Sequence, residues 1–378
     1  MKYFLSSLLL AACFQACSPS HEAIRTLAVP IETISDYVPL STIAEVAYCI
    51  PLETRDSVQV DSIHKIVAQG DKYYVADEDV LHCFDAVGRH LYMLDKRGDR
   101  PGEYTVLSDF DVDAAGNIWV LAPRNRALYK YAPDGTYMEG IALDFDAMKI
   151  KLMDERRMAV YQGALMEEEG KTLHIYDLQT KQRTASYMPA DPYQSQYLHV
   201  FTKNHFSRSY AERDGWNFFR LFNDTVYRLT NEGVIPQYVV KTGDENIPAE
   251  FYHSRYENVL SFFERLYETT YAYGTDLFIE NSAGYYYHFL YDRHNLLAFL
   301  PKEEGATPIV TRGIRENISL SGFPIDFDDE YVQVFLQTDN SLIIPLPADR
   351  LYAFTGGEQF AGENLNPVLL HIELKKNK

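Results

Sequence analysis

The sequence predicts an all-β fold, a six-bladed β-propeller with a short helical insertion near residues 248–266. Three observations support this prediction. One strand-rich unit, seen most clearly at residues 80–143, recurs along the chain. Each copy begins in the same way, with a turn followed by a short apolar strand. Finally, residues 369–374 alternate like residues 173–178, which indicates that one terminus completes a blade begun by the other.

The unit around Gly116 shows why the pattern is typical of a blade. Gly116 and Asn117 tolerate the positive φ that a tight turn needs. Residues 118–121, Ile-Trp-Val-Leu, form an apolar run that suits a buried strand. Residues 127–131 then alternate as a half-buried strand does, and the sequence Pro-Asp-Gly at 133–135 turns the chain again.

The combination of a turn and an apolar strand occurs six times. The six turns lie at Gly70, Gly116, Arg156, Gly215, Gly284 and Asn340. Successive turns are 40 to 69 residues apart, and a four-stranded blade takes roughly 40–50 residues. We interpret this as six blades with insertions in the later ones. The alternative is a β-sandwich or two β domains, but no linker of low complexity divides the chain.

The insertion is predicted because the spacing of apolar residues changes from a strand-like to a helix-like period. Pro248 is well placed as a first helical residue. The aromatic and aliphatic residues that follow, among them Phe251, Val259 and Phe262, lie near helical spacing. We therefore expect one or two helical segments between the fourth and fifth blades.

The first seventeen residues predict a lipoprotein signal peptide. Lys2 precedes an apolar run at residues 3–12 that is too short to span a bilayer. Cys13 and Cys17 follow, and we expect lipid attachment at Cys17 because cleavage before Cys13 would leave a very short signal. Cys13 stays open as an alternative, as does an ordinary secretory signal. The predicted organisation is a signal peptide at 1–17, a tether at 18–40 and a propeller at 41–378, exported and anchored to the outer membrane.

Composition limits the partners. The formal net charge of −19 argues against nucleic acid and against electrostatic binding to an anionic leaflet. We expect membrane contact through the lipid anchor alone, and a monomeric body. Beyond the signal peptide only Cys49 and Cys83 remain, so a disulfide and two buried free thiols are both open. The 29 tyrosines and 21 phenylalanines fit β-propensity or sugar stacking.

Residues 97–104 carry a family resemblance. They read Arg-Gly-Asp-Arg-Pro-Gly-Glu-Tyr, which resembles the Gly-x-Gly-Pro-Gly-Glu-Tyr loop of six-bladed β-propeller lipoproteins of Bacteroidetes, a family of domains of unknown function. Asp99 and Arg100 replace the usual pair, so the inner glycine is missing. Further matches are Ile-Pro-Leu-Glu at 50–53, Phe-Asn-Asp-Thr-Val-Tyr at 222–227 and Asn-Pro-Val-Leu at 366–369. Residues 112–120 also resemble NHL-type propellers. The resemblance implies an exported, anchored propeller and supplies no catalytic set.

The same loop provides the candidate ligand-binding residues. Arg97 and Arg100 could present two cations to an anionic ligand, with Glu103 beside them. The alternative is structural: Pro101 and Gly102 shape a turn, and Glu103 accepts hydrogen bonds from a neighbouring blade.

Two acidic groups are expected to be solvated rather than metal-binding. Asp109, Asp111 and Asp113 share one face of a predicted strand, but Ala114 and Val120 stand where a calcium-binding loop needs glycine and glutamate. We interpret these aspartates as a solvated or capping face. A second run, formed by Asp326, Asp328, Asp329 and Glu330, is interpreted as a solvated loop. No metal and no cofactor is expected.

The sequence favours a binding role over catalysis. Its histidines show no metal-binding spacing, and it contains neither a nucleophile elbow nor a phosphate-binding loop. The leading hypothesis is a non-enzymatic, lipid-anchored module that binds an envelope protein, a peptide or a glycan through its loops. The alternative is a metal-dependent hydrolase or lactonase with its site at the central channel, and a purely structural envelope component is a third possibility.

Overall fold

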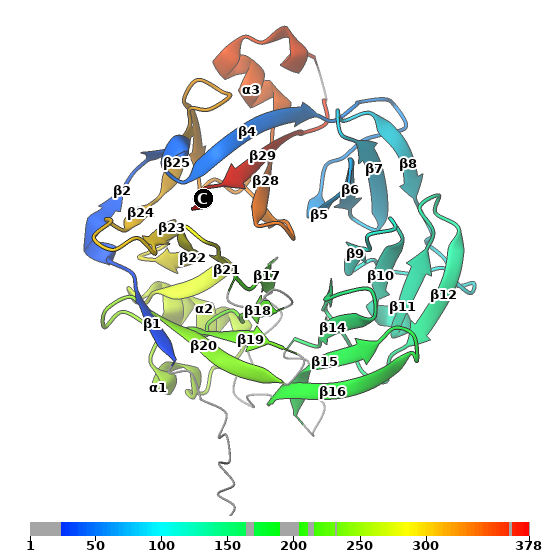
Figure 1. Ribbon diagram of the computed structural model, residues 1–378, viewed down its shortest axis with the longest axis horizontal. Coiled ribbons are helices and arrows are strands. Elements are labelled where there is room, and N and C mark those ends of the chain that lie inside the picture. The colour runs from blue at the N-terminus through cyan, green and yellow to red at the C-terminus, as the bar shows by residue number, and fades with distance from the viewer. Residues whose placement is uncertain are drawn as a thin grey trace, which may run out of the picture.

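The computed structural model describes residues 24–163, 170–189, 204–210, 215–230, 233–362 and 365–377. These residues form seven β-sheets arranged in a ring (Figure 1). The colours of Figure 1 follow one another around the ring, so each sheet lies beside the next one in the sequence. The fold is therefore an all-β propeller, as predicted. It has seven blades, and the prediction of six was wrong.

Five sheets are built from four consecutive strands, and two of these five gain an extra strand from the N-terminal segment. The first sheet contains β5 (Ile63–Gln69), β6 (Lys72–Asp77), β7 (Val80–Asp85) and β8 (His90–Leu94), and the second contains β9 (Asp109–Val112), β10 (Ile118–Ala122), β11 (Ala127–Tyr131) and β12 (Tyr137–Ala142). The third contains β13 (Lys149–Leu152), β14 (Arg157–Tyr161), β15 (Lys171–Asp177) and β16 (Gln182–Pro189), and the fourth contains β17 (Phe206–Arg208), β18 (Trp216–Phe218), β19 (Thr225–Leu229) and β20 (Val234–Lys241). The fifth contains β21 (Tyr273–Glu280), β22 (Gly284–Tyr291), β23 (His294–Pro301) and β24 (Ile309–Thr311). The first strands β5, β9, β17 and β21 lie toward the centre of the ring (Figure 1).

The six predicted turns all lead into the second strand of a sheet. Five of the turn residues precede β6, β10, β14, β18 and, in the seventh sheet, β28 (Ser341–Leu346), and Gly284 is the first residue of β22. Gly70 and Gly116 adopt φ of +63° and +82°, as the turns require. The repeat was thus recognised correctly wherever a sheet has its full set of strands.

The overlooked sheet is the sixth. It contains only β25 (Gly313–Glu316), β26 (Phe323–Asp326) and the two-residue β3 (Val38–Pro39). Such short strands carry no long apolar run. In the sequence this sheet therefore appears only as a wide interval between the predicted turns at Gly284 and Asn340. The turn before β26 does contain a glycine, Gly322, with φ of +94°. That glycine is the sequence feature by which this blade could have been recognised.

Both chain ends build the seventh sheet. Its order is β27 (Phe335–Leu336), β28, β29 (Val368–Leu374) and β4 (Ala44–Pro51). The C-terminal strand β29 pairs antiparallel with β4 from the N-terminal part, for example His371 opposite Tyr48. The predicted closure by the two termini is confirmed, and it removes an open edge from the ring.

The N-terminal segment also extends three other sheets. Strands β1 (Arg25–Ala28), β2 (Ile34–Ser35) and β3 pair in parallel with β20, β24 and β25. Each lies at the end of its sheet, and the short helices η1 (Ile31–Thr33) and η2 (Leu40–Thr42) connect them to each other and to β4. Residues 25–39, which we expected within the tether, are therefore the outermost strands of the fourth, fifth and sixth sheets (Figure 1).

The predicted insertion forms two short helices, α1 (Ala249–Tyr252) and α2 (Val259–Tyr267). Asn258 and Ser261 cap the start of α2 reciprocally, and Phe262 and Leu266 are buried. A third helix, α3 (Ala348–Thr355), was not predicted; it lies outside the ring between β28 and β29 and ends at Gly356 with φ of +64° (Figure 1). None of the helices in the described residues is long and apolar enough to span a membrane.

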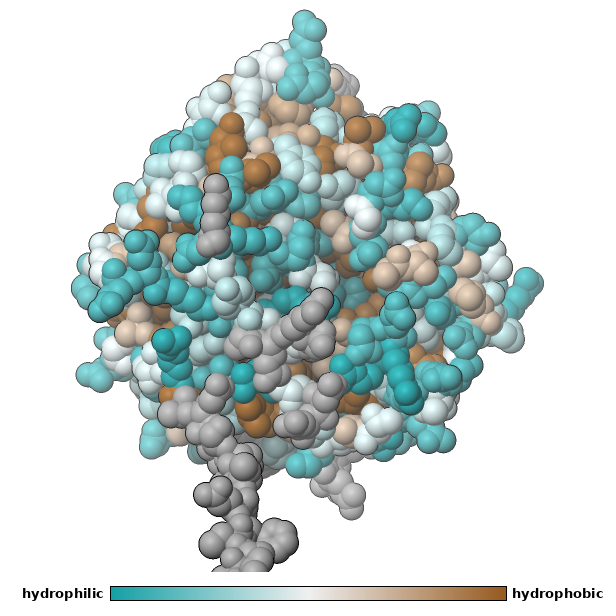
Figure 2. All heavy atoms as spheres, in the orientation of Figure 1, coloured by the Kyte–Doolittle hydropathy of each residue, from teal (hydrophilic) through white to brown (hydrophobic). Residues whose placement is uncertain are grey.

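The core lies between neighbouring sheets. Trp119 and Leu121 of the second sheet, for example, pack with Met158 and Val160 of the third. Cys49 and Cys83 are both free thiols, and burial raises the pKa of each to about 11. On the face shown in Figure 2, hydrophobic residues form small separate groups among hydrophilic ones.

Candidate functional site

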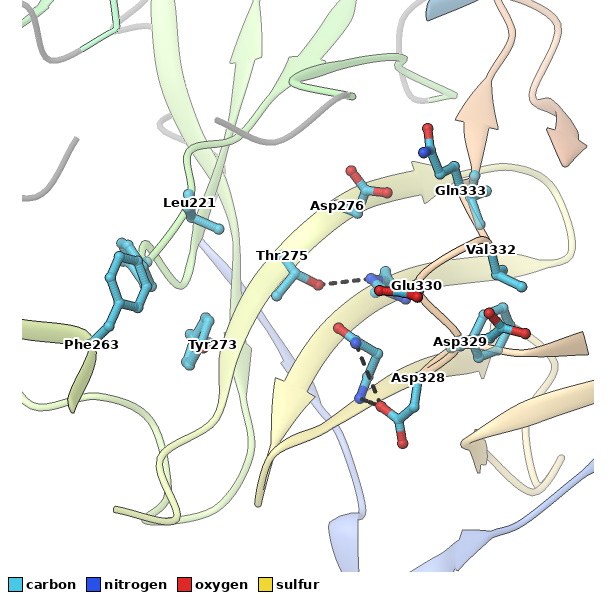
Figure 3. A pocket seen from close by; sticks show the side chains of 15 residues that line it. Leu221, Phe263, Tyr273, Thr275, Asp276, Asp328, Asp329, Glu330, Val332 and Gln333 are labelled. Atoms are coloured by element: carbon cyan, nitrogen blue, oxygen red, sulfur yellow. Dashed lines mark hydrogen bonds between the residues drawn. The ribbon is translucent and has the colours of Figure 1, made fainter. Parts of the chain in front are cut away.

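A cavity of about 380 Å³ lies beside the fifth sheet. Its lining comes from the loop between β18 and β19, from the insertion, from β21 to β23, and from residues 327–334 between the sixth and seventh sheets. The two walls differ in chemistry. Figure 3 shows Leu221, Phe263 and Tyr273 on one side, and Asp276, the acidic residues 328–330 and Gln333 on the other. We call this cavity the aromatic–acidic cleft.

The aromatic wall exists because the insertion brings its own small core. Phe262 and Leu266 of α2 are buried with Leu221 and Phe222, and Phe263 on the same helix reaches the cleft. Phe222 is held at φ of +61°, a conformation that non-glycine residues rarely adopt. The Tyr252 hydroxyl of α1 donates to the Phe222 carbonyl and so supports this conformation.

The polar wall is organised by hydrogen bonds. Thr275 Oγ1 lies 2.7 Å from His288 Nδ1 (Figure 3). Asp328 accepts hydrogen bonds from the Asn295 backbone N–H and from His294 Nδ1, each at 2.7 Å. Glu330 is exposed and makes no hydrogen bond or ion pair with any residue in the described part of the chain. It is the carboxylate in this wall that can meet a ligand without losing a partner.

The acidic run is therefore more than a solvated loop. The Tyr37 hydroxyl donates to Asp326 at 3.0 Å, and Asp329 forms an ion pair with Arg350. Together with Asp328, these contacts fix the segment before β27 to the N-terminal segment, to β23 and to α3. The sequence prediction missed them because all the partners are distant in the chain.

The predicted ligand-binding loop, residues 97–104, closes on itself. Arg97 is half exposed and pairs with Asp95 at 2.6 Å. The Glu103 carboxylate accepts the Arg100 backbone N–H at 3.0 Å, within its own loop and not from a neighbouring blade. A Cβ at Gly98 would come within 2.0 Å of the same carboxylate. Arg100 is exposed, and ligand binding by Arg97, Arg100 and Glu103 stays a prediction.

Two tyrosines hold this loop between the first and second sheets. Tyr104 is fully buried, and its hydroxyl donates to the Asp79 carbonyl at 3.0 Å. The Tyr131 hydroxyl donates to the Gly102 carbonyl at 2.7 Å, and Gly102 has φ of +80°. A Cβ on Gly102 would lie 2.5 Å from the Tyr137 ring, so only glycine fits there. Most of the family-like loop thus has a packing role.

The aspartates of the second sheet were wrongly placed. We expected Asp109 and Asp111 on a solvated or capping face; they are only 1% and 2% exposed, so they are not solvated. They lie on β9 and accept the backbone N–H groups of Ile150 and Leu152 in the next blade, each at 2.8 Å. Lys65 and Lys151 compensate their charges at 2.7 and 3.0 Å. Asp113 does cap a turn, accepting the Asn117 N–H at 2.8 Å.

Cys17 lies outside the described residues, so lipid attachment stays a prediction. Within the described residues, no three His, Cys, Asp or Glu side chains are grouped so that they could hold a metal ion.

The family is decided by comparison of the sequence with family models. The model for a domain of unknown function, DUF4934, matches residues 27–375. The chain belongs to the DUF4934 family. The match begins in β1 and ends just after β29, so the DUF4934 domain includes the N-terminal strands as well as the ring.

One solved structure supports the fold of this DUF4934 domain. A protein of Bacteroides fragilis described as a "putative exported protein" is similar at a TM-score of 0.72 and 16% identity, over 93% of this chain and 100% of that one. A member of the DUF4221 family from Bacteroides vulgatus is similar at a TM-score of 0.49 and 11% identity, over 88% of this chain and 98% of that one. No curated protein matches the sequence.

Proposed function

We propose that this DUF4934 protein is an exported, lipid-anchored binding module of the cell envelope, and that a cationic ligand occupies the aromatic–acidic cleft. The observation that carries the proposal is the pairing of an aromatic wall with an acidic wall across a cavity of about 380 Å³. Cavities that hold small ligands have volumes of roughly 300–1,000 Å³ and combine apolar surface with a few placed polar groups.

The chemistry of the two walls selects for positive charge. A cation is attracted to the face of an aromatic ring such as Phe263 or Tyr273. It forms charge-assisted hydrogen bonds with a carboxylate such as Glu330. The net charge of −19 adds a long-range attraction for cations. A peptide segment with lysine or arginine side chains is the form in which an envelope partner would present such a group.

Strain beside the cleft gives further support. Phe222 keeps its unfavourable φ of +61° next to the cavity, at a cost of about 1–3 kcal/mol for such a backbone conformation. Such positions persist where the surrounding structure fixes them, and they cluster at ligand-binding sites. Export is supported by the apolar run at the N-terminus and by the description of the similar B. fragilis protein, and anchoring by the N-terminal cysteines alone.

The test measures binding of fluorescent peptides by anisotropy. Peptides with lysine and arginine are compared with acidic peptides of equal length. We expect binding of the basic peptides alone, weakened by salt because exposed charges are screened. Glu330→Gln should weaken binding about threefold, since a solvent-exposed ion pair contributes under about 1 kcal/mol. The matched control is Glu304→Gln, an exposed carboxylate in the loop between β23 and β24.

A second pair of variants tests the aromatic wall. Phe263 lines the cleft, whereas Tyr267 on the same helix is 52% exposed. Phe263→Ala should weaken peptide binding more than Tyr267→Ala does. Equal effects of the two substitutions, or equal affinity for acidic and basic peptides, would exclude this cleft as the binding site.

A further inference from the structure

Three lysine side chains converge on a second, much smaller cavity near the centre of the ring. This cavity has a volume of about 40 Å³ and is lined by Lys65, Lys149 and Lys151, with Asp109 as the one acidic residue in its lining. The remaining lining comes from β5, β13, residues 204–206 and residues 336–338. In a chain with a net charge of −19, this concentration of positive charge marks a site of different character from the aromatic–acidic cleft.

Two of the three lysines are already neutralised. Lys65 pairs with Asp109 at 2.7 Å, and Lys151 pairs with Asp111 at 3.0 Å. Lys149 has no carboxylate within 4.0 Å among the residues that the structure describes. Burial lowers the pKa of Lys149; the charges of Asp109 and Asp276 oppose this shift, and the charge of Lys65 adds to it. The Lys149 ammonium is therefore a desolvated cation that lacks a close counter-ion in the described chain.

A buried histidine faces the same cavity. His205 is 3% exposed and lines the cavity. Its Nδ1 lies 2.9 Å from the Phe219 carbonyl oxygen, which can only accept, so Nδ1 carries the proton. Burial lowers the pKa of His205 to about 3, so the ring is neutral at pH 7 and Nε2 is an acceptor. This Nε2 is buried and has no hydrogen-bond partner in the described structure.

We infer that the centre of the ring binds a small oxyanion that keeps one hydroxyl group, such as hydrogen phosphate. Its anionic oxygen accepts hydrogen bonds from Lys149, and its hydroxyl donates to His205 Nε2. A water molecule needs about 10–15 Å³ measured in this way, so a cavity of about 40 Å³ has room for one tetrahedral ion. Sulfate carries no proton at neutral pH and leaves the buried acceptor unsatisfied. This site is independent of the function proposed for the cleft.

The experiment is a calorimetric titration of the purified full chain with inorganic phosphate at pH 7 and constant ionic strength. Sulfate is the matched control, and methyl phosphate tests whether the phosphoryl group belongs to a free ion or to a monoester. We expect phosphate to bind at least roughly tenfold more tightly than sulfate, because bound sulfate leaves the buried His205 Nε2 without a hydrogen-bond donor. Binding of phosphate alone indicates the free ion, and equal binding of methyl phosphate indicates an ester. Equal binding of sulfate overturns the inference.

Variants separate binding from a structural role. Lys149→Met should abolish phosphate binding while leaving the melting temperature in phosphate-free buffer unchanged or higher, because it removes a desolvated charge. His205→Asn keeps a donor for the Phe219 carbonyl and should remove the preference for phosphate over sulfate. Lys171→Met, at an exposed lysine of β15, is the control and should change neither property. A lower melting temperature for Lys149→Met, with phosphate binding retained, shows that Lys149 only balances Asp109 and Asp276.

Discussion

Asn366 and Val60 are 306 positions apart in the chain, yet the Asn366 side-chain oxygen accepts the Val60 backbone N–H at 2.9 Å. The same side chain donates to the carbonyls of Glu53 and Val58, at 2.9 and 3.0 Å. Its backbone N–H donates to Thr54 Oγ1 at 2.8 Å. Asn366 is 3% exposed and lies two residues before the start of β29. One residue therefore organises the loop that joins the last blade to the first.

Replacing Asn366 should weaken the closed ring. Asn366→Ala leaves one N–H and two carbonyl groups of residues 53–60 without their partner, and each unsatisfied buried group costs about 1–3 kcal/mol. We expect the free energy of unfolding to fall by roughly 2–5 kcal/mol, measured by urea denaturation. Asn377→Ala, at an exposed position, should change it by less than about 0.5 kcal/mol. A loss for Asn366→Ala no larger than that of the control would show that the loop is closed by other contacts.

The repeat could be predicted because it follows local rules. A turn at Gly116 followed by four apolar residues needs only the neighbouring sequence to be recognised. The sixth sheet escaped this approach because β25 and β26 have four residues each and β3 comes from a part of the chain about 275 residues earlier. Closure of one blade by the two termini was predicted because such closure is a general feature of propellers, and the structure shows that it pairs β29 with β4.

The sites were harder to predict because they depend on contacts between blades. Asp109 was expected on a solvated or capping face, since an alternating strand normally places its polar residues outward. In the structure every residue of β9 is buried, and Lys65 and Ile150 from two other blades make burial of Asp109 possible. The aromatic–acidic cleft joins segments from residue 221 to residue 334. The predicted insertion, the Phe-Asn-Asp-Thr motif at 222–225 and the acidic run at 326–330 were the three parts of it visible in the sequence.

The loop at residues 97–104 contains a buried tyrosine, Tyr104, and two arginines, Arg97 and Arg100, whose contributions to stability should differ. Arg97 is 53% exposed in its ion pair with Asp95, and such pairs contribute about 0–1 kcal/mol. The double variant Arg97→Ala and Arg100→Ala should therefore leave the melting temperature nearly unchanged. Tyr104→Phe should lower the free energy of unfolding by about 1–2 kcal/mol, because its buried hydroxyl satisfies the Asp79 carbonyl. Thermal and urea denaturation of the variants check both values.

The outcome also bears on ligand binding by this loop. A large loss of stability in the double arginine variant would assign Arg97 and Arg100 a structural role. An unchanged melting temperature leaves them available for the anionic ligand that the sequence predicts.

Buried histidines should make the protein sensitive to mild acid. Burial lowers the pKa of His205 to about 3 and that of His174 to about 4, from about 6.5 in the unfolded chain. The unfolded state therefore binds more protons between these values, so stability is fully present above pH 6.5 and is lost as the pH falls toward 3. We expect a decline of a few kcal/mol over this interval, measured by urea denaturation at several pH values.

A single variant isolates the contribution of His205. His205→Asn removes the titrating ring, so the slope of unfolding free energy against pH between 6.5 and 3 should become smaller. His253→Asn, in the loop after α1, is the control because His253 is exposed and should leave the slope unchanged. An identical slope in all three proteins would mean that protonation of His205 does not oppose folding.

The lipid anchor is tested at the two N-terminal cysteines. Cys17→Ala should abolish incorporation of an alkyne-tagged fatty acid and release the protein from the membrane fraction, because the modified cysteine is the expected membrane attachment. Cys13→Ala is the matched control and should leave labelling intact. Labelling that survives Cys17→Ala but not Cys13→Ala moves the attachment to Cys13. Labelling absent from the unmodified chain excludes a lipid anchor and leaves an ordinary secreted propeller.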